Sequence, residues 1–183
     1  MRRILCLLFL FSQMGGVTVF AGDSAVLTRT FYVAGVECGA CVYLVQVAAS
    51  ECKGVLKADV VQTVDNYANV TFDPRLISEH QIAQAIRDAM PLHGTPYLAR
   101  LKLRVGEYSK HAAALDALFQ KWRDWVRWEV LDAAKGEMGV HFLPLQTAPA
   151  GTGPGGWSTQ QFQSALTAAL PTGVSVQFIE EKP

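Results

Sequence analysis

The sequence predicts an α+β fold in which one strand–helix–strand–strand–helix–strand unit occurs twice in tandem. Three observations support this fold class. Segments with strand periodicity and segments with helical periodicity follow one another in the same order in both halves of the chain. Landmark residues recur at similar offsets, 71 positions from Gly35 to Gly106 and 70 positions from Phe72 to Phe142. Half of the 183 residues are apolar and the formal net charge is zero, which suits a globular chain with one or two cores.

The balanced charge and the lack of reactive motifs argue against two classes of function. No basic stripe stands out along the chain, so nucleic acid is not an expected partner. The sequence shows no nucleophile placed with a base, no phosphate-binding loop and no paired carboxylates, so it gives no argument for an enzyme. We therefore expect a binding or carrier protein.

Residues 1–21 have the pattern of an export signal. Arg2 and Arg3 precede the apolar run 4–11, and the segment 19–21 offers small residues where a signal peptidase cuts. The apolar run is shorter than the roughly 20 residues of a membrane span, so we expect no span in the mature protein. The paired arginines also fit twin-arginine export, but the short lead-in and the very apolar core favour ordinary secretion. A periplasmic or secreted location follows.

The first unit, residues 22–100, contains six expected elements. Alternating β-branched and aromatic residues mark its strands, an apolar stripe marks its first helix, and Ser78 with Gln81 forms a capping box at the start of its second helix. In chain order these features place a strand at 25–34, a helix at 41–53, hairpin strands at 55–64 and 67–72, a helix from Ser78 and a strand at 97–105. This order packs as one antiparallel sheet with both helices on one face, the ferredoxin-like arrangement.

The second unit, residues 101–183, repeats this order without any cysteine. The strand at 97–105 can serve as the last strand of the first unit and the first strand of the second. The expected elements that follow are a helix from His111 to Val126, hairpin strands at 128–134 and 138–145, an insert at 147–156, a helix from Ser158 and a strand at 174–179. With an offset of 71, Ser109 takes the place of Cys38 and Ala112 that of Cys41. The second unit is therefore expected to be a degenerate copy without metal thiols.

Cys38 and Cys41 lie where the first strand gives way to the first helix. The thiolate is the form that binds metal, and a helix N-terminus lowers the pKa of a thiol. Two soft sulfur atoms on an exposed loop suit Cu(I) or Hg(II). Cys52 lies eleven residues beyond Cys41, roughly 16 Å at the helical rise, so we predict a core thiol there instead.

The thiol pair stands in a longer pattern. Residues 32–41 read YVAGVECGAC, and they are followed by Gly54-Val55 and by VTFDP at 70–74. This pattern, which spans most of the first unit, resembles the heavy-metal-associated domain of copper chaperones, metal-exporting ATPases and the periplasmic mercury-binding protein. The resemblance implies a ferredoxin-like fold and a role in metal transport or detoxification. It also implies that Cys38 and Cys41 bind Cu(I), Hg(II) or a divalent ion such as Zn(II).

Two further residues are candidate ligands. Glu37 resembles the acidic residue that precedes the first cysteine in zinc, cadmium and lead transporters, although an exposed loop glutamate is the commoner explanation. His93 lies in the loop before the fourth strand, which this fold places at the same edge as the thiol loop, and some family members have a histidine there. A solvated loop histidine is the alternative. The residues alone leave both choices open.

The first helix departs from the family, whose members present Lys-rich positions on it to an acidic partner. Here its outer side shows Tyr43, Leu44 and Val47. A helix that is apolar all round is usually buried, so we expect the second unit to dock over it. A membrane metal transporter is a candidate partner by resemblance, but the helix lacks the charge pattern for docking on such a pump.

Thiol–disulfide exchange is the competing function, because a Cys-x-x-Cys pair at a helix start is also a redox arrangement. That function normally has a thioredoxin-like context. Here a hairpin follows the thiol helix, and no Trp precedes Cys38. In an oxidising compartment a disulfide between Cys38 and Cys41 would compete with metal. Metal binding is the favoured hypothesis.

Overall fold

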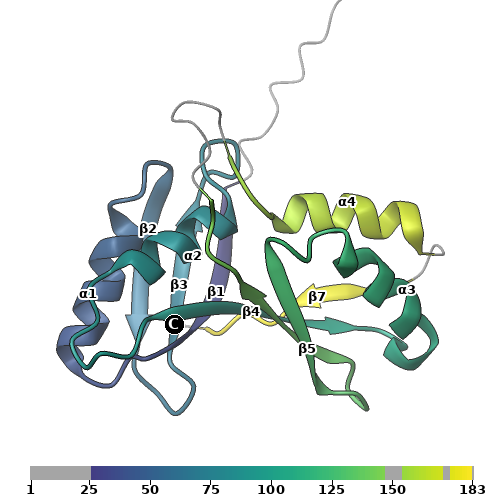
Figure 1. Ribbon diagram of the computed structural model, residues 1–183, viewed down its shortest axis with the longest axis horizontal. Coiled ribbons are helices and arrows are strands. Elements are labelled where there is room, and N and C mark those ends of the chain that lie inside the picture. The colour runs from purple at the N-terminus through teal and green to yellow at the C-terminus, as the bar shows by residue number, and fades with distance from the viewer. Residues whose placement is uncertain (1–25, 147–153, 171–173, 183) are drawn as a thin grey trace, which may run out of the picture.

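The computed structural model describes residues 26–146, 154–170 and 174–182. Within these ranges it contains seven strands and four helices (Figure 1). In chain order they are β1 Leu27–Ala34, α1 Gly39–Ser50, β2 Val55–Val61, β3 Tyr67–Phe72, α2 Glu79–Asp88, β4 Leu98–Val105, α3 Tyr108–Gln120, β5 Val126–Asp132, β6 Glu137–Phe142, α4 Thr159–Ala169 and β7 Val176–Phe178. The expected export signal and most of the expected insert lie outside the described residues. In the described part of the chain, no helix has both the length and the apolar character needed to cross a membrane.

The strands join one sheet in the order β2-β3-β1-β4-β6-β5, and β7 also pairs with β4. The strand β4 belongs to both units. Its first part, Leu98–Arg100, pairs with β1, its last part, Leu103–Val105, pairs with β7, and β6 lies along its other edge. All of these pairings are antiparallel. The structure thus confirms two ferredoxin-like units that share a strand, and the expected boundary between residues 100 and 101 falls inside this strand.

The helix α1 begins directly at the thiol pair. The Cys38 backbone is extended (φ −152°, ψ 167°), and its sulfur accepts a hydrogen bond from the backbone N–H of Cys41 at 3.4 Å. Cys41, Val45 and Ala49 recur every four residues and are fully buried, so they define the face that packs on the sheet. The chain turns back at Gly54 (φ 105°), as the sequence predicted.

A core of aromatic rings continues across both units. The ring of Phe31 on β1 lies 6.2 Å from that of Phe142 on β6, which in turn lies 5.9 Å from Trp157 before α4. Trp157 contacts Phe162 of α4 at 5.8 Å, and Phe162 stacks on Phe119 of α3 at 5.1 Å. The two units therefore share one core as well as one strand.

Polar contacts also join the units. Arg29 of β1 donates to Thr159 at the start of α4 (3.3 Å) and to Glu180 of the C-terminal segment (3.2 Å). Its Nε lies 3.9 Å from the carboxylate of Glu79 at the start of α2, and Glu79 accepts hydrogen bonds from the N–H and hydroxyl of Thr159. Glu79 is only 1% exposed, so these donors take the place of water around its carboxylate oxygens.

His80, the next residue of α2, is fully buried at the same junction. Its Nε2 lies 2.7 Å from the carbonyl oxygen of Leu143, and the backbone N–H of Trp157 donates to its Nδ1 at 3.2 Å. Only a neutral ring with its proton on Nε2 satisfies both partners. Gly156 (φ 76°) permits this approach, because a Cβ there would lie 2.5 Å from Nδ1.

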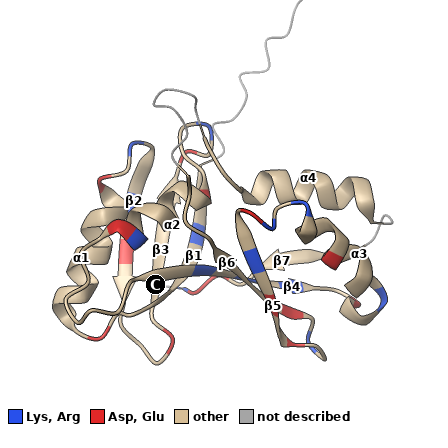
Figure 2. Cartoon of the chain, viewed as in Figure 1, with Lys and Arg blue, Asp and Glu red and all other residues tan. Residues whose placement is uncertain are grey.

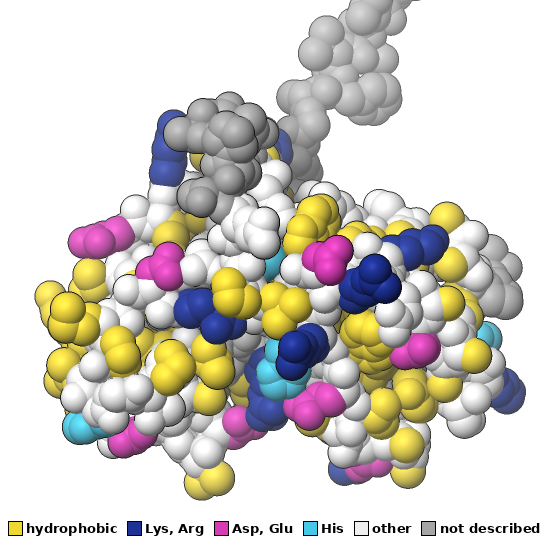
Figure 3. Space-filling model, viewed as in Figure 1, with side chains coloured by type: hydrophobic (Ala, Val, Ile, Leu, Met, Phe, Trp, Pro, Cys, Tyr) yellow, Lys and Arg dark blue, Asp and Glu magenta, His cyan; other side chains and the backbone are white. Residues whose placement is uncertain are grey.

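The expectation that the second unit covers the outer side of α1 is wrong. Tyr43 on that side is 67% exposed. Figure 1 shows α3 and α4 at the opposite end of the molecule from α1. In Figure 2 α1 shows no charged residue, and in Figure 3 hydrophobic side chains gather over this end of the molecule. The second unit attaches by extending the sheet, which satisfies the backbone of β4 on both edges and leaves α1 free.

The register of the repeat also differs from the expectation. Four residues separate β1 from α1, whereas only two separate β4 from α3, so α3 begins two positions earlier than the offset of 71 implies. Glu107 is the N-cap of α3, and Glu107 and Lys110, rather than Ser109 and Ala112, correspond to the two cysteines. Glu107 and Lys110 form an ion pair. The conclusion that the second loop has no thiols is unchanged.

The end of α3 is a second correction. We expected the helix to reach Val126, but it ends at Gln120. Tight turns follow, in which Trp122 and Trp125 each donate their backbone N–H to a carbonyl three residues earlier. Val126 is fully buried as the first residue of β5. An apolar residue at this position is compatible with a helical stripe and with a strand, and in the structure Val126 pairs with Phe142 of β6 in the sheet.

Candidate metal centre

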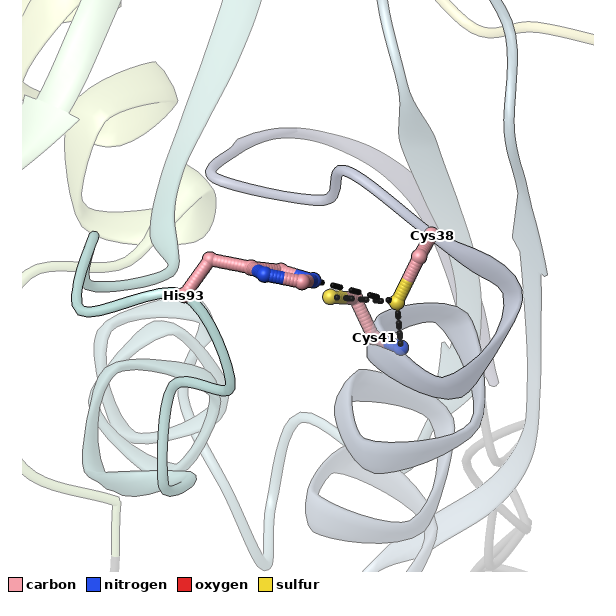
Figure 4. A group of neighbouring side chains, drawn as sticks. All are labelled: Cys38, Cys41 and His93. Atoms are coloured by element: carbon pink, nitrogen blue, oxygen red, sulfur yellow. Dashed lines mark hydrogen bonds between the residues drawn. The ribbon is translucent and has the colours of Figure 1, made fainter.

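Cys38, Cys41 and His93 come together at one edge of the first unit (Figure 4). The two sulfur atoms lie 3.1 Å apart, and His93 Nε2 lies 3.4 Å from the sulfur of Cys38. One ligand atom from each residue falls within 4.8 Å of the others. Cys41 is fully buried, Cys38 is half-buried and His93 is exposed, so the cluster has a closed inner side and an open outer side.

A glycine brings the two loops of this cluster into contact. Gly35, at φ 85°, begins the loop between β1 and α1. A Cβ at this position would lie 2.7 Å from the carbonyl oxygen of Pro96, in the loop that carries His93. Only glycine tolerates both the left-handed backbone and this close approach. The spacing between the thiols and the imidazole therefore depends on Gly35.

The surroundings of Cys38 favour its thiolate. The Cys41 thiol and, after it, the Cys41 backbone N–H hold the pKa of Cys38 below its usual value by hydrogen bonding to its sulfur. Such a thiolate is the species that binds a soft metal ion. The ion would replace the proton that the two sulfur atoms share at 3.1 Å.

Tyr97 lies beneath the cluster and was not singled out by the sequence analysis. Its side chain is fully buried, and its hydroxyl has no hydrogen-bond partner among the described residues. Burial and, after it, the neighbouring Cys41 thiol raise the pKa of Tyr97. An aromatic residue at the start of a strand is ordinary, so the only available signal was its place three residues after Gly94 in the histidine loop.

The remaining sequence candidates lie elsewhere. The structure does not bring Glu37 into the cluster, because its side chain is exposed and contributes no atom to the group of converging ligands. Cys52 is half-buried beyond the end of α1, where its thiol donates to the carbonyl of Ala48 at 3.4 Å. Burial raises the pKa of Cys52, which disfavours its thiolate. The expected core position of Cys52 is therefore only partly realised.

Comparison with known proteins places this geometry in a family. The heavy-metal-associated domain matches residues 30–90. A protein of Haemophilus influenzae described only as uncharacterized is 36% identical over 62 residues, which cover 88% of its length and 34% of this chain. The chain therefore belongs to the heavy-metal-associated domain family, and its first unit carries the Cys-x-x-Cys metal-binding site of that family.

Other relatives have more specific names. The copper-transporting ATPase RAN1 of Arabidopsis thaliana is 44% identical over 57 residues, 31% of this chain, and the chain spans only 6% of the ATPase. The crystal structure of a copper-binding domain from a P-type ATPase is 39% identical, with 34% of this chain and 82% of that chain covered, at a TM-score of 0.32. The match to the water-soluble region of the P-type ATPase CopA from Bacillus subtilis covers 84% of this chain and 91% of that structure's chain, at 17% identity and a TM-score of 0.39.

Proposed function

We propose that this protein binds a soft heavy-metal ion through Cys38 and Cys41 and carries it outside the cytoplasm. The observation that supports this most strongly is the convergence of two thiols and an imidazole within 4.8 Å at a half-open edge. A binding site with an open side allows the ion to be taken up and passed on, which suits a carrier. The proposed export rests on the basic and apolar pattern of residues 1–21.

Cu(I) and Hg(II) are the ions that this ligand set suits best. Two thiolates and one imidazole are soft to borderline ligands, and both ions accept two or three of them. Structural Zn(II) sites normally take four protein ligands, so Zn(II) would need a further ligand here. We therefore rank Zn(II) third. By analogy with the copper-transporting ATPase among the relatives, a membrane metal transporter is the proposed exchange partner, which would have to dock without charged residues on α1, because that helix has none.

A titration of the reduced protein without residues 1–21 tests this function. We expect Cu(I) and Hg(II) to bind with one ion per chain and Zn(II) to bind more weakly. The double variant C38S/C41S should lose more than about 100-fold in affinity, because both thiolates are gone. C52S is the matched control and should bind as the parent does. Equal binding by the double variant and the parent would refute the site.

The contribution of His93 can be measured in the same titration. We expect H93A to lower the Cu(I) affinity by roughly tenfold, because its Nε2 is the third ligand atom at the open side. The variant H111A, which lies on α3 in the second unit, is the control and should not change the affinity. Identical affinities of H93A and the parent would show that His93 is a solvated loop residue.

Thiol–disulfide exchange remains the second candidate, because the sulfur atoms lie 3.1 Å apart and the pKa of Cys38 is lowered. A redox protein would catalyse disulfide exchange with all metals chelated, and its dithiol would have a reduction potential in the range of redox catalysts. A metal carrier would show neither property. Measurement of both on the same preparation separates the two functions.

A further inference from the structure

The thiol loop is held from a second side by the turn between β2 and β3. The Asn66 side chain donates from Nδ2 to the carbonyl oxygen of Val36 at 2.8 Å and accepts from the Thr63 N–H at 2.9 Å. The backbone carbonyl oxygen of Asn66 also accepts a hydrogen bond from the backbone N–H of Val33 at 2.8 Å. The donor and the acceptor on this amide fix its orientation, since the Val36 carbonyl can only accept and the Thr63 N–H can only donate.

These contacts bracket the short loop that carries the first thiol. Val36 precedes Cys38 by two residues, and its side chain is buried at 3% exposure. On the other side the same loop abuts Pro96, in the histidine loop, through Gly35. The loop is thus held between the hairpin turn and the segment that carries His93.

We propose that Asn66 is a positioning residue of the metal centre. Its hydrogen bond to Val36 fixes the loop backbone so that the sulfur of Cys38 faces Nε2 of His93, which makes a three-ligand site instead of a two-thiol site. The inference rests on the proposed metal-binding function. It adds a residue that lies 28 positions from Cys38 in the sequence and contributes no ligand atom to the cluster.

The chemistry of the contact suggests the variant to make. Aspartate at this position keeps an oxygen to accept from Thr63 N–H but has no donor for the Val36 carbonyl. N66D therefore preserves the bond within the turn and removes the bond to the loop. N69D is a matched control, because Asn69 lies on the same hairpin and its amide contacts Thr30 and the carbonyl of Glu181 instead of the thiol loop.

A double-mutant cycle on the reduced protein tests the proposal, with Cu(I) affinity measured by competition for the parent, N66D, H93A and N66D/H93A. We expect N66D to lose about tenfold and N69D to match the parent. We also expect the His93 substitution to cost much less in the N66D background, because Cys38 no longer faces the histidine. X-ray absorption should show three ligands around Cu(I) in the parent and two in N66D.

The outcomes separate this inference from the proposed function. If the parent binds Cu(I) and the effects of N66D and H93A are additive, or N66D binds as the parent does, Asn66 does not position the site. If the parent and C38S/C41S bind alike, the metal function itself fails. Thermal unfolding identifies a variant that does not fold, and in that case N66S replaces N66D, because serine can still accept from Thr63 N–H but is too short to reach Val36.

Discussion

At the scale of single residues, the atoms around the sulfur of Cys38 set the chemistry of the metal centre. The Cys41 thiol and N–H favour the thiolate, and Nε2 of His93 lies 3.4 Å from the sulfur on the open side of the cluster. Neither of these neighbours would suffice without Gly35, whose missing Cβ lets the two loops touch. Of the residues that form the site, only the two cysteines can therefore be recognised in the sequence from their spacing.

The buried hydroxyl of Tyr97 leads to a prediction about stability. Because the hydroxyl makes no hydrogen bond of good geometry among the described residues and neighbours the weakly bonding Cys41 thiol, its removal in Y97F should leave the free energy of unfolding unchanged or raise it by up to about 1 kcal/mol. Y32F is the comparison, since Tyr32 is equally buried but donates to Glu181 at 2.7 Å, and it should lose about 1–2 kcal/mol. Urea denaturation of the metal-free protein measures both. A loss above about 2 kcal/mol for Y97F would contradict the prediction.

At the scale of elements, a Ser-x-x-Gln sequence begins α2 in the first unit and α4 in the second, but it makes more hydrogen bonds at α2. At α2, Ser78 accepts from the Gln81 N–H and the Gln81 side chain bonds back, which completes the capping box. At α4, Ser158 accepts from the Gln161 N–H. Ser78 also donates to the carbonyl of Gly155, in the segment that leads into α4. The cap of the first unit is therefore also a contact between the units.

This difference predicts unequal costs for the same substitution. S78A should lower the free energy of unfolding by about 2 kcal/mol, because it removes the cap and leaves Gly155 without its donor. S158A should cost about 1 kcal/mol or less, since only the cap is lost. Urea denaturation at neutral pH measures both values. Equal costs would show that the contact with Gly155 contributes nothing to stability.

At the scale of the whole molecule, the junction between the units depends on the neutral form of His80. Burial lowers the pKa of His80; the hydrogen bond to the Leu143 carbonyl opposes this shift in part, and Arg87 on the same helix adds to it. Arg29 of β1, Glu180 of the C-terminal segment and Glu79, the residue before His80, carry the other charges of this junction, while α4 has no charged residue. Protonation would place a second N–H against that of Trp157, so the charged ring does not fit the junction.

The lowered pKa of His80 determines how the stability of the protein depends on pH. A histidine whose pKa is lower in the folded than in the unfolded protein stabilises the fold above about pH 6.5, and this contribution is lost as the pH falls toward the folded pKa. We expect the parent to lose up to about 1.4 kcal/mol per pH unit from this group below pH 6.5, and H80Q to lack that part of the slope. Denaturation at pH 7.5 and pH 5 measures it. Parallel slopes for parent and H80Q would contradict the role of His80.

Much of the fold was accessible from local pattern. The strand and helix order, the turn at Gly54 and the capping box at Ser78 are each encoded within a few residues, and the structure confirms them. The start of α3 was misplaced, because the loop before it is two residues shorter than its counterpart and a constant offset cannot register a deletion. The cover expected over α1 was wrong, because an apolar outer face does not say which surface, if any, packs on it.

The sequence alone determined the identity of the thiol pair, the repeated unit and the loss of thiols in the second copy, because these depend on residue type and short spacing. Only the tertiary structure decided which distant groups meet the thiols. It brought His93 to Cys38, left Glu37 outside, placed Tyr97 beneath Cys41 and set Asn66 against Val36. The contacts of His93, Tyr97 and Asn66 each join residues 30 or more positions apart, and they exist because the sheet aligns the ends of its strands.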